Sequence, residues 1–425
     1  MVNRRNFLKS SAMLSSALLM PFSQGFAKSD FKDTSLESLR STNAEDESYW
    51  KMVRGFFAPI TDSHINLENG YFSAQPQNTL NTFKGEVSRL NAENSFYMRE
   101  LQSGIVEEAK NALSTFSNIP VSEFVICRNT TEALDTVIHG YPWQKGDEVV
   151  LSKQDYGSMQ AAFEQEARRH GIKLRYVQIP LNPSSDEELV DVYQKAMGNK
   201  TRMVLLTHLI NLTGQILPVK KICEMVHSHG AEVMLDAAHS FAHIQFSIKD
   251  LNVDYMGTSL HKWLCCPLGL GMLYIKEEKI QKIWPLFGDD QFAESDIRKL
   301  EHYGTRPVSA IASIKRAIEF HDAIGSQRKE NRLRFLKQYW WNQTKDLNKI
   351  IYNTPDDSHR SCAISNFLIE GYTPTELAKT LVNDFNIFTV AINSPEVSGV
   401  RVTPHLYTNT QELDSLANAV KDLCS

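Results

Sequence analysis

Short apolar runs alternate with amphipathic helical segments between residues 124 and 275, and this pattern constrains the fold more than any other feature of the sequence. The runs that predict strands are 124–128, 147–152, 173–179, 202–208, 232–238, 254–259 and 271–275. Helical spacing of apolar residues predicts helices at 131–140, 158–170 and 219–229. Nearly continuous apolar strands separated by helices are typical of a mostly parallel sheet covered on both faces. The sequence therefore predicts an α/β fold built on such a sheet.

Composition excludes several classes of protein. The chain has 425 residues, of which 42% are hydrophobic and 22% are charged, so it can bury a large core and is not disordered as a whole. Its 45 basic and 50 acidic residues give a net charge of −5, which leaves no basic excess for binding nucleic acid. Its 6 cysteines, with no CxxC pair, do not make a disulfide scaffold. No apolar run reaches the roughly 18–20 residues that a stable membrane span needs.

Residues 1–27 have the features of an export signal. Arg4 and Arg5 precede Phe7 and a short apolar stretch, and small residues up to Ala27 suit a cleavage site. This arrangement resembles a twin-arginine signal peptide, which directs folded proteins to the twin-arginine translocase. We therefore expect a periplasmic protein that folds around a cofactor before export. A retained membrane anchor and an ordinary N-terminus are the alternatives.

The rest of the chain divides into three parts by its sequence texture. Residues 28–64 predict an N-terminal arm with a first helix, 65–305 a large cofactor-binding domain, and 306–425 a smaller α+β domain. Within the last part, 309–348 is a long charged stretch of helical character. Ligands of parallel sheets bind at the carboxyl ends of the strands, so the polar residues that follow each predicted strand are the candidates for a site.

Three polar features follow the predicted strands and together indicate pyridoxal 5′-phosphate (PLP). Lys262 lies in the loop 257–271 among apolar and aromatic neighbours, where desolvation lowers the pKa of an amine and makes it nucleophilic. Asp236 ends an apolar strand, and a buried carboxylate there needs a cationic partner. Thr130 and Thr131 begin a helix whose free N–H groups can hold a phosphate. Each feature alone also suits an ordinary loop or helix cap, but an amine, a carboxylate and a phosphate cradle in this order match the cofactor.

Several longer strings carry a resemblance to a known family. They are INLENGYFS (65–73), RNTTEALD (128–135), DYGSM (155–159), THLINLTGQILPV (207–219), MLDAAHSFAH (234–243), GTSLHKWLCCPLGLG (257–271), YGTRP (303–307) and GVRVTPHLYT (399–408). In their order and spacing the chain resembles the class V aminotransferase family of fold-type I PLP-dependent enzymes, and within it the isopenicillin N epimerase-like branch. The resemblance implies a fold-type I PLP-dependent transferase, with a mostly parallel sheet in the large domain and a smaller α+β C-terminal domain.

The resemblance also implies roles for individual residues. Lys262 matches the lysine that forms a Schiff base with the cofactor, and Asp236 matches the partner of its pyridinium nitrogen. The residues that match its phosphate ligands are Thr130, Thr131, Ser259 and His261. Those that match groups around its ring are Tyr156, His239, Asn211 and Thr213. A core tyrosine, a structural histidine and a simple turn are the alternatives for this last set.

Two further positions bear on assembly and on substrate binding. Thr305 resembles the residue that reaches the phosphate of the other subunit, which implies a homodimer. Arg401 resembles the arginine that binds the substrate carboxylate, a task suited to the planar guanidinium. A surface arginine on a strand is the alternative for Arg401.

One departure from the family narrows the reaction. Desulfurases of this family carry a cysteine on a mobile loop shortly before the arginine equivalent to Arg401, whereas residues 391–401 contain no cysteine. We therefore expect an exported enzyme that acts at Cα of an amino acid, or of an amino-acid group in a peptide-like metabolite such as a siderophore. Epimerisation and transamination are the expected reactions, and β-elimination, decarboxylation and a non-catalytic ligand-binding protein are the alternatives. No spacing of His, Cys or Asp residues predicts a metal site.

Overall fold

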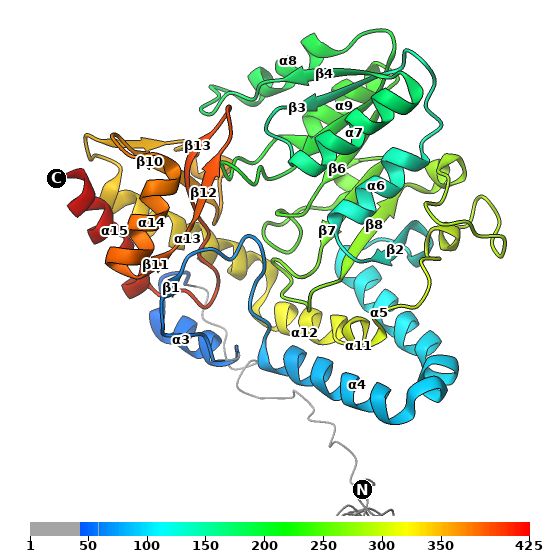
Figure 1. Ribbon diagram of the computed structural model, residues 1–425, viewed down its shortest axis with the longest axis horizontal. Coiled ribbons are helices and arrows are strands. Elements are labelled where there is room, and N and C mark those ends of the chain that lie inside the picture. Colours follow the sequence, from blue (N-terminus) through cyan, green and yellow to red (C-terminus); the bar gives the residue numbers. More distant parts are fainter. Residues whose placement is uncertain (1–42, 58) are drawn as a thin grey trace, which may run out of the picture. The chain divides into compact units, whose positions relative to one another are not determined.

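A seven-stranded sheet forms the centre of the larger part of the molecule (Figure 1). The computed structural model describes residues 43–57 and 59–425. The strands of this sheet are β2 (Phe124–Cys127), β3 (Glu148–Ser152), β4 (Lys173–Val177), β5 (Thr201–Thr207), β6 (Glu232–Asp236), β7 (Tyr255–Ser259) and β8 (Gly271–Ile275). Their order is β2-β8-β7-β6-β5-β3-β4, with β8 antiparallel to both neighbours and all other pairs parallel. The mostly parallel α/β sheet predicted from the sequence is therefore confirmed.

Helices cover both faces of this sheet, which explains why its strands are nearly continuously apolar. Successive strand residues point to opposite faces. In β5, Val204 and Leu206 pack into the core on one face, and Met203 and Leu205 pack into the core on the other. The helices that contribute to the first core include α5 (Gln102–Ser117), α8 (Asp186–Ala196) and α9 (Val219–Ser228). Those that contribute to the second are α6 (Thr130–Gly140) and α7 (Gly157–His170).

The predicted helices are present, and the described part of the chain has further helices that the sequence did not predict. Helices α6, α7 and α9 begin and end within one residue of the segments predicted for them. The structure adds α4 (Gln77–Phe96), α5 and α8. In α4 the only fully buried side chain is that of Thr79, so this helix has no apolar stripe by which a sequence would reveal it.

The charged stretch at 309–348 is not one continuous helix. It is divided among α11 (Val308–Ile311), α12 (Ile314–Ile324) and α13 (Ser326–Thr344). Gly325 separates the last two with a φ of 90°, a conformation that favours glycine and ends α12. Arg332 and Lys337 in α13 are buried despite their charge. The long methylene chains of Arg and Lys can pack against apolar neighbours. The positions of charged residues alone therefore did not identify the face of the helix that is exposed to solvent.

A second sheet, of four antiparallel strands, lies in the C-terminal part (Figure 1). Its strands, in spatial order, are β12 (Val390–Asn393), β13 (Ser398–Val402), β10 (Ser365–Ile369) and β9 (Ile350–Tyr352). The core beside it is completed by α13, α14 (Pro374–Phe385) and α15 (Thr410–Cys424). The short β1 (Ile65–Asn66) pairs in parallel with β11 (Ile387–Phe388). The segment that begins at Ile65 therefore lies against the C-terminal part.

The N-terminal predictions fall only partly on the described residues. The expected export signal at 1–27 lies outside them. Within the arm expected at 28–64, the structure has α3 (Glu47–Gly55), which buries Trp50 and Val53. No helix in the described part of the chain is long and apolar enough to cross a membrane. The described residues belong to one compact unit, and a domain boundary at 305 stays a prediction.

Candidate active site

The candidate site lies at the edge of the seven-stranded sheet where the parallel strands have their carboxyl ends. Strands β3, β5, β6 and β7 are parallel, and β2 runs in the same direction as β7 because both are antiparallel to β8. The predicted site residues that end or follow these strands include Thr130, Tyr156, Asn211, Asp236 and Ser259. The strand topology therefore collects residues that are far apart in the sequence at the edge where such sheets bind ligands.

The amine of Lys262 lies beside an imidazole ring and is partly buried. Its Nζ is 3.2 Å from Nε2 of His239. Burial lowers the pKa of Lys262 from 10.5 to about 8. The positive charge of Arg401 contributes to this lowering, whereas the carboxylates of Asp236 and Glu68 oppose it. A large fraction of the amine is therefore neutral near pH 8, as a nucleophile must be.

Trp263 determines which nitrogen of His239 carries the proton. Its indole N–H donates to Nδ1 of His239 over 3.4 Å. An indole can only donate, so the proton of the neutral imidazole lies on Nε2. Burial lowers the pKa of His239 well below its usual value, which keeps the ring neutral. The Nε2–H group therefore points at the Lys262 amine, which accepts this hydrogen bond in its neutral form.

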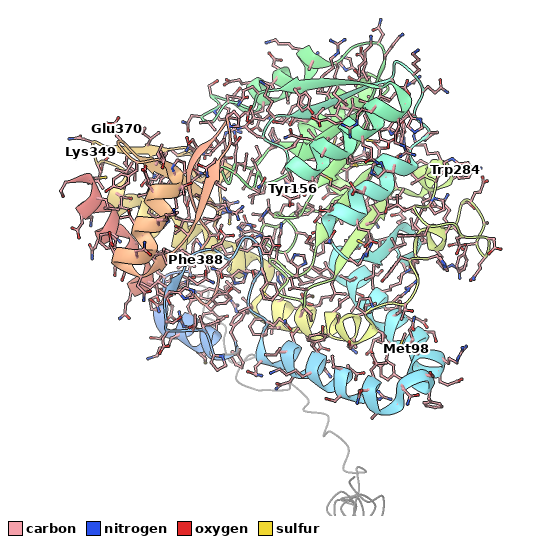
Figure 2. The ribbon with its side chains drawn as sticks, in the orientation of Figure 1. Met98, Tyr156, Trp284, Lys349, Glu370 and Phe388 are labelled. Atoms are coloured by element: carbon pink, nitrogen blue, oxygen red, sulfur yellow. The ribbon has the colours of Figure 1, made fainter. Side chains whose placement is uncertain are left out.

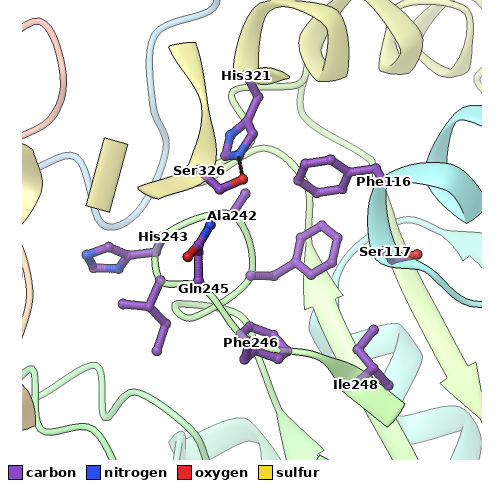
Figure 3. Close-up of a pocket in the computed structure, with 11 residues that line it drawn as sticks. Phe116, Ser117, Ala242, His243, Gln245, Phe246, Ile248, His321 and Ser326 are labelled. Carbon is purple, nitrogen blue, oxygen red and sulfur yellow. Dashed lines mark hydrogen bonds between the residues drawn. The ribbon is translucent and has the colours of Figure 1, made fainter. Parts of the chain in front are cut away.

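Stacking fixes Trp263 in turn. Its ring centroid is 3.6 Å from that of His243, at an interplanar angle of 22°, and 5.2 Å from that of His405, at 15°. His243 also lines a cavity of about 310 Å³, where His321 is hydrogen-bonded to Ser326 over 2.9 Å (Figure 3). The described residues that line this cavity include none of those predicted to form the site. The cavity is therefore distinct from the predicted site residues, and His243 connects its lining to Trp263.

Two buried carboxylates lie at the ends of β6 and β3. Asp236 is 4% exposed, and its Oδ1 accepts the backbone N–H of Ala238 over 2.9 Å. Burial raises the pKa of Asp236, an effect that this hydrogen bond and the charge of Lys262 oppose. Asp155 accepts the hydroxyl of Thr207 over 2.6 Å. Burial, with the negative charge of Asp236, raises the pKa of Asp155 to about 7.

Predicted phosphate ligands meet at the N-terminus of α6. The Oγ1 of Thr130 is 2.7 Å from the Oγ of Ser259, which also accepts the backbone N–H of Thr130 over 3.0 Å. The side chain of Asn129 caps another N–H group of the first turn, so the backbone N–H of Thr131 is left for a ligand. The Nδ1 of His261 is buried without a hydrogen-bond partner. Burial lowers the pKa of His261 to about 4, so this ring is neutral.

Two predicted residues are exposed. Tyr156 directly precedes α7 and is 46% exposed, so its ring is open to a ligand (Figure 2). Thr305 is exposed in the loop before α11, where another subunit can reach it. Their expected contacts, with the cofactor ring and with the phosphate of a partner subunit, stay predictions.

Arg401 is buried rather than on the surface, and it joins the C-terminal sheet to the loop after β5. Its side chain is 9% exposed, and its Nη1 donates to the carbonyl of Asn211 over 3.1 Å. In the same loop, the Oγ1 of Thr213 accepts the backbone N–H of Gln215, and the carbonyl of Thr213 accepts the hydroxyl of Thr354 over 2.5 Å. Thr213 therefore holds the loop in place, whereas the Oδ1 of Asn211 is buried without a partner.

The unpartnered groups and the close packing at this edge fit PLP. The buried Nδ1 of His261 and the start of α6 would hold the phosphate, Asp236 would face the ring nitrogen, and Lys262 would hold the aldehyde carbon. A Cβ on Gly271 would lie 2.6 Å from the Cα of Asn129, so only glycine lets β8 support the start of α6 so closely. The charges and donors required by each end of the cofactor are thus present.

Fold and site together define a fold-type I PLP-dependent enzyme. The structure of a C-DES mutant with glycine covalently linked to the PLP cofactor matches with a TM-score of 0.78 and 21% identity, covering 87% of this chain and 99% of that one. The cysteine desulfurase CsdA of Escherichia coli matches with a TM-score of 0.77 and 20% identity, covering 88% and 98%. The chain belongs to the aminotransferase class-V family, whose model matches residues 69–407. The predictions of the fold type, of PLP as cofactor and of an enzyme are thereby confirmed.

Relatives in this family carry out different reactions. The chain is 26% identical to the isopenicillin N epimerase of Streptomyces clavuligerus over 392 residues, which cover 88% of this chain and 98% of that protein. It is 24% identical to a probable cysteine desulfurase of Synechocystis sp. over 351 residues, covering 77% and 82%. The similarity spans most of the length of each relative, which agrees with membership of the family. Because these relatives have different activities, the similarity does not assign a reaction to this chain.

Sequence analysis missed three residues of this site. Trp263 directly follows Lys262, and its place beside the lysine is the signal that could have identified it. Asp155 precedes Tyr156, but an aspartate after a strand is also an ordinary cap. Glu68 contacts Arg401 across 333 positions of the sequence, and no local pattern predicts such a pair.

Proposed function

We propose that the protein catalyses a PLP-dependent reaction at Cα of an amino acid, or of an amino-acid group in a peptide-like metabolite. The observation that carries this proposal is the amine of Lys262, with a pKa of about 8, next to His239 and within electrostatic reach of Asp236. Arg401 supplies a cation for the substrate carboxylate within electrostatic reach of the same amine.

Each of these side chains has a distinct task. Bound PLP supplies an electron sink for the charge that develops when a bond at Cα breaks. The negative charge of Asp236 would favour a proton on the ring nitrogen of bound PLP. Lys262 takes a proton from Cα and returns it, since its pKa lies close to neutral pH. His239 orients the Lys262 amine through its Nε2–H group.

The cysteines disfavour desulfuration through a persulfide on the protein. Cys127, Cys223, Cys265, Cys266 and Cys362 are buried, and Cys424 is partly buried. Burial raises the pKa of Cys265 to about 11 and that of Cys362 to about 12. A thiol accepts sulfur as the thiolate, which such environments suppress. Among the remaining reactions, epimerisation and transamination are the leading assignments.

The isopenicillin N epimerase relatives support epimerisation among these reactions. β-Elimination and decarboxylation use the same lysine and aspartate, and the choice depends on which Cα bond stands perpendicular to the cofactor ring. A non-catalytic protein that binds a ligand in this fold is the alternative of another class. The retained set of Lys262, Asp236 and Arg401 argues against it.

A PLP titration followed by visible absorbance tests the proposal. We expect a band from the covalent attachment of PLP to Lys262, which forms with a midpoint near pH 8 because capture requires the neutral amine. An ordinary lysine would require a pH near 10.5. Addition of amino acids of either configuration, and of short peptides, should then change the band for at least one compound. Analysis of the chirality and the keto-acid content of that compound assigns the reaction.

Two outcomes would contradict the proposal. If the protein takes up no PLP at any pH, it does not use this cofactor for chemistry. If the band forms but no amino compound alters it, the ligand-binding alternative is favoured.

We further propose export to the periplasm and a homodimer. The adjacent Arg4 and Arg5 before an apolar stretch support export, and the exposure of Thr305 supports a second subunit that completes the site. Cell fractionation should place the protein in the periplasm, and replacement of both arginines by lysine should retain it inside the cell. Light scattering should give the mass of two chains. Wild-type protein that stays inside the cell, or a monomer, would refute the respective proposal.

A further inference from the structure

The guanidinium of Arg401 is already paired within the chain. Its Nη2 donates to Oε1 of Glu68 over 2.6 Å, and its Nε donates to Oε2 of the same carboxylate over 3.2 Å. The two side chains are 9% and 7% exposed. The arginine expected to bind the substrate carboxylate therefore has a bidentate carboxylate partner along one edge before substrate arrives.

Glu68 is itself held in place on several sides. Its Oε1 also accepts the backbone N–H of Tyr71 over 3.0 Å, and its Oε2 lies 3.4 Å from the Oγ1 of Thr403. A Cβ on Gly70 would lie 3.2 Å from Nη2 of Arg401, so the turn 68–71 also closes tightly against the guanidinium. These contacts hold the Glu68 side chain in one position, because moving it would break a buried ion pair and leave a backbone N–H group without its acceptor.

The pairing leaves a limited number of donors for the substrate. A guanidinium has five N–H bonds. Glu68 accepts two of them and the carbonyl of Asn211 accepts one. The two N–H bonds that remain can bind one further carboxylate.

We propose that Glu68 is a positioning residue that determines specificity: it fixes Arg401 from one side and offsets its charge, so that the site selects a substrate with one free carboxylate next to its amino group. This inference rests on the proposed function. It adds the form of the substrate, which is a free amino acid, or an amino-acid group joined to a peptide-like molecule through its side chain, so that its α-amino and α-carboxyl groups are both free. A substrate whose α-carboxyl group is an amide would lose the charge-assisted contact to Arg401.

In the alternative interpretation of this ion pair, the substrate carboxylate displaces Glu68 from Arg401. In that case Glu68 competes with the substrate carboxylate for Arg401, and removal of Glu68 would tighten carboxylate binding. In the positioning reading, removal of Glu68 frees the guanidinium to turn away, and carboxylate binding weakens. The two readings therefore predict changes of opposite sign.

Electrostatics link the pair to the reacting amine. Burial is the main cause of the lowered pKa of Lys262, and the positive charge of Arg401 lowers this pKa further. The negative charges of Asp236 and Glu68 raise it. The neutral His239 contacts the amine directly. Loss of the Glu68 charge would therefore move the pH midpoint of PLP capture downward, which a purely structural defect would not do.

The test measures binding of propionate to the PLP-loaded protein by calorimetry, with propionamide as the uncharged probe of the same shape. Glu68→Gln is expected to weaken propionate binding at least about tenfold, the scale of a lost hydrogen bond to a charged group. Propionamide binding should change little. Glu68→Asp, which keeps the charge but shortens the side chain, should also weaken propionate binding and covers the case in which Glu68→Gln fails to fold. Tighter or unchanged propionate binding in the folded variants would overturn the inference.

Glu412→Gln is a matched control. Glu412 pairs with Arg54 over 2.9 Å in the described part of the chain, on α15. This variant also loses a carboxylate from an ion pair and a helix cap, but it should leave propionate binding unchanged. A wild-type protein that takes up PLP, with Glu68 variants that bind propionate normally, would refute only this inference. A wild-type protein that takes up no PLP would refute the proposed function.

Discussion

Replacement of Lys262 by alanine is expected to lower turnover of any active amino acid at least about 10³-fold, the scale for loss of a group that acts both as nucleophile and in proton transfer. The variant should still take up PLP, because the donors at Ser259, His261 and the start of α6 do not depend on the lysine. The absorbance band of the covalently held cofactor should disappear, and borohydride should no longer attach PLP to the protein. Turnover, absorbance and mass of the reduced protein are the three measurements.

Lys337→Met is the matched control for this experiment. Lys337 is also buried, and burial lowers its pKa to about 8 as well. Its Nζ lies 3.7 Å from the ring centroid of Trp341 on α13, so it has no place in the candidate site. We expect a change in stability but no change in turnover per folded molecule. Normal turnover by Lys262→Ala would remove the lysine from the mechanism and with it the proposed assignment.

The parts of the fold that sequence analysis predicted are those whose local pattern agrees with their burial. Strands such as β5 are apolar on both faces through their central residues, Met203 to Leu206, because helices cover both faces of the sheet. The opposite case is α4, which buries almost none of its residues fully and therefore shows no periodic apolar stripe. In α13 the charged Arg332 and Lys337 are buried, so charge misreports the side that faces solvent.

The residues of the candidate site also fall into those that the sequence predicted and those that only the three-dimensional fold reveals. Lys262, Asp236 and Thr130 end or follow strands, and a parallel sheet brings those positions together whatever their spacing in the sequence. The pair of Glu68 and Arg401 depends instead on β1 and β13, which the three-dimensional fold brings close across most of the chain. Tautomer selection in His239 depends on the rotamer of Trp263, which no sequence pattern specifies.

Gly214→Ala is expected to lower the free energy of unfolding by at least about 3 kcal/mol, at the upper end for single substitutions. An added Cβ would lie 2.0 Å from the carbonyl oxygen of Ile364, a backbone atom that cannot move without shifting the segment before β10. The backbone of Gly214 also has a φ of +77°, which disfavours any residue with a side chain. The loop that it belongs to carries Asn211 and the contacts of Thr213. Denaturant unfolding measures the loss.

Gly230→Ala separates the two causes of that loss. Gly230 has a φ of +76°, almost the same as that of Gly214, but an added Cβ there would meet no heavy atom within 4 Å. Its cost should therefore be the conformational one alone, about 1–2 kcal/mol. The difference between the two variants measures how tightly the loop after β5 is docked on the C-terminal part. If that docking also holds Asn211 against Arg401, propionate binding should weaken in Gly214→Ala and stay unchanged in Gly230→Ala. Equal stability losses and equal propionate affinities would show that the close approach of Gly214 to Ile364 does not support the site.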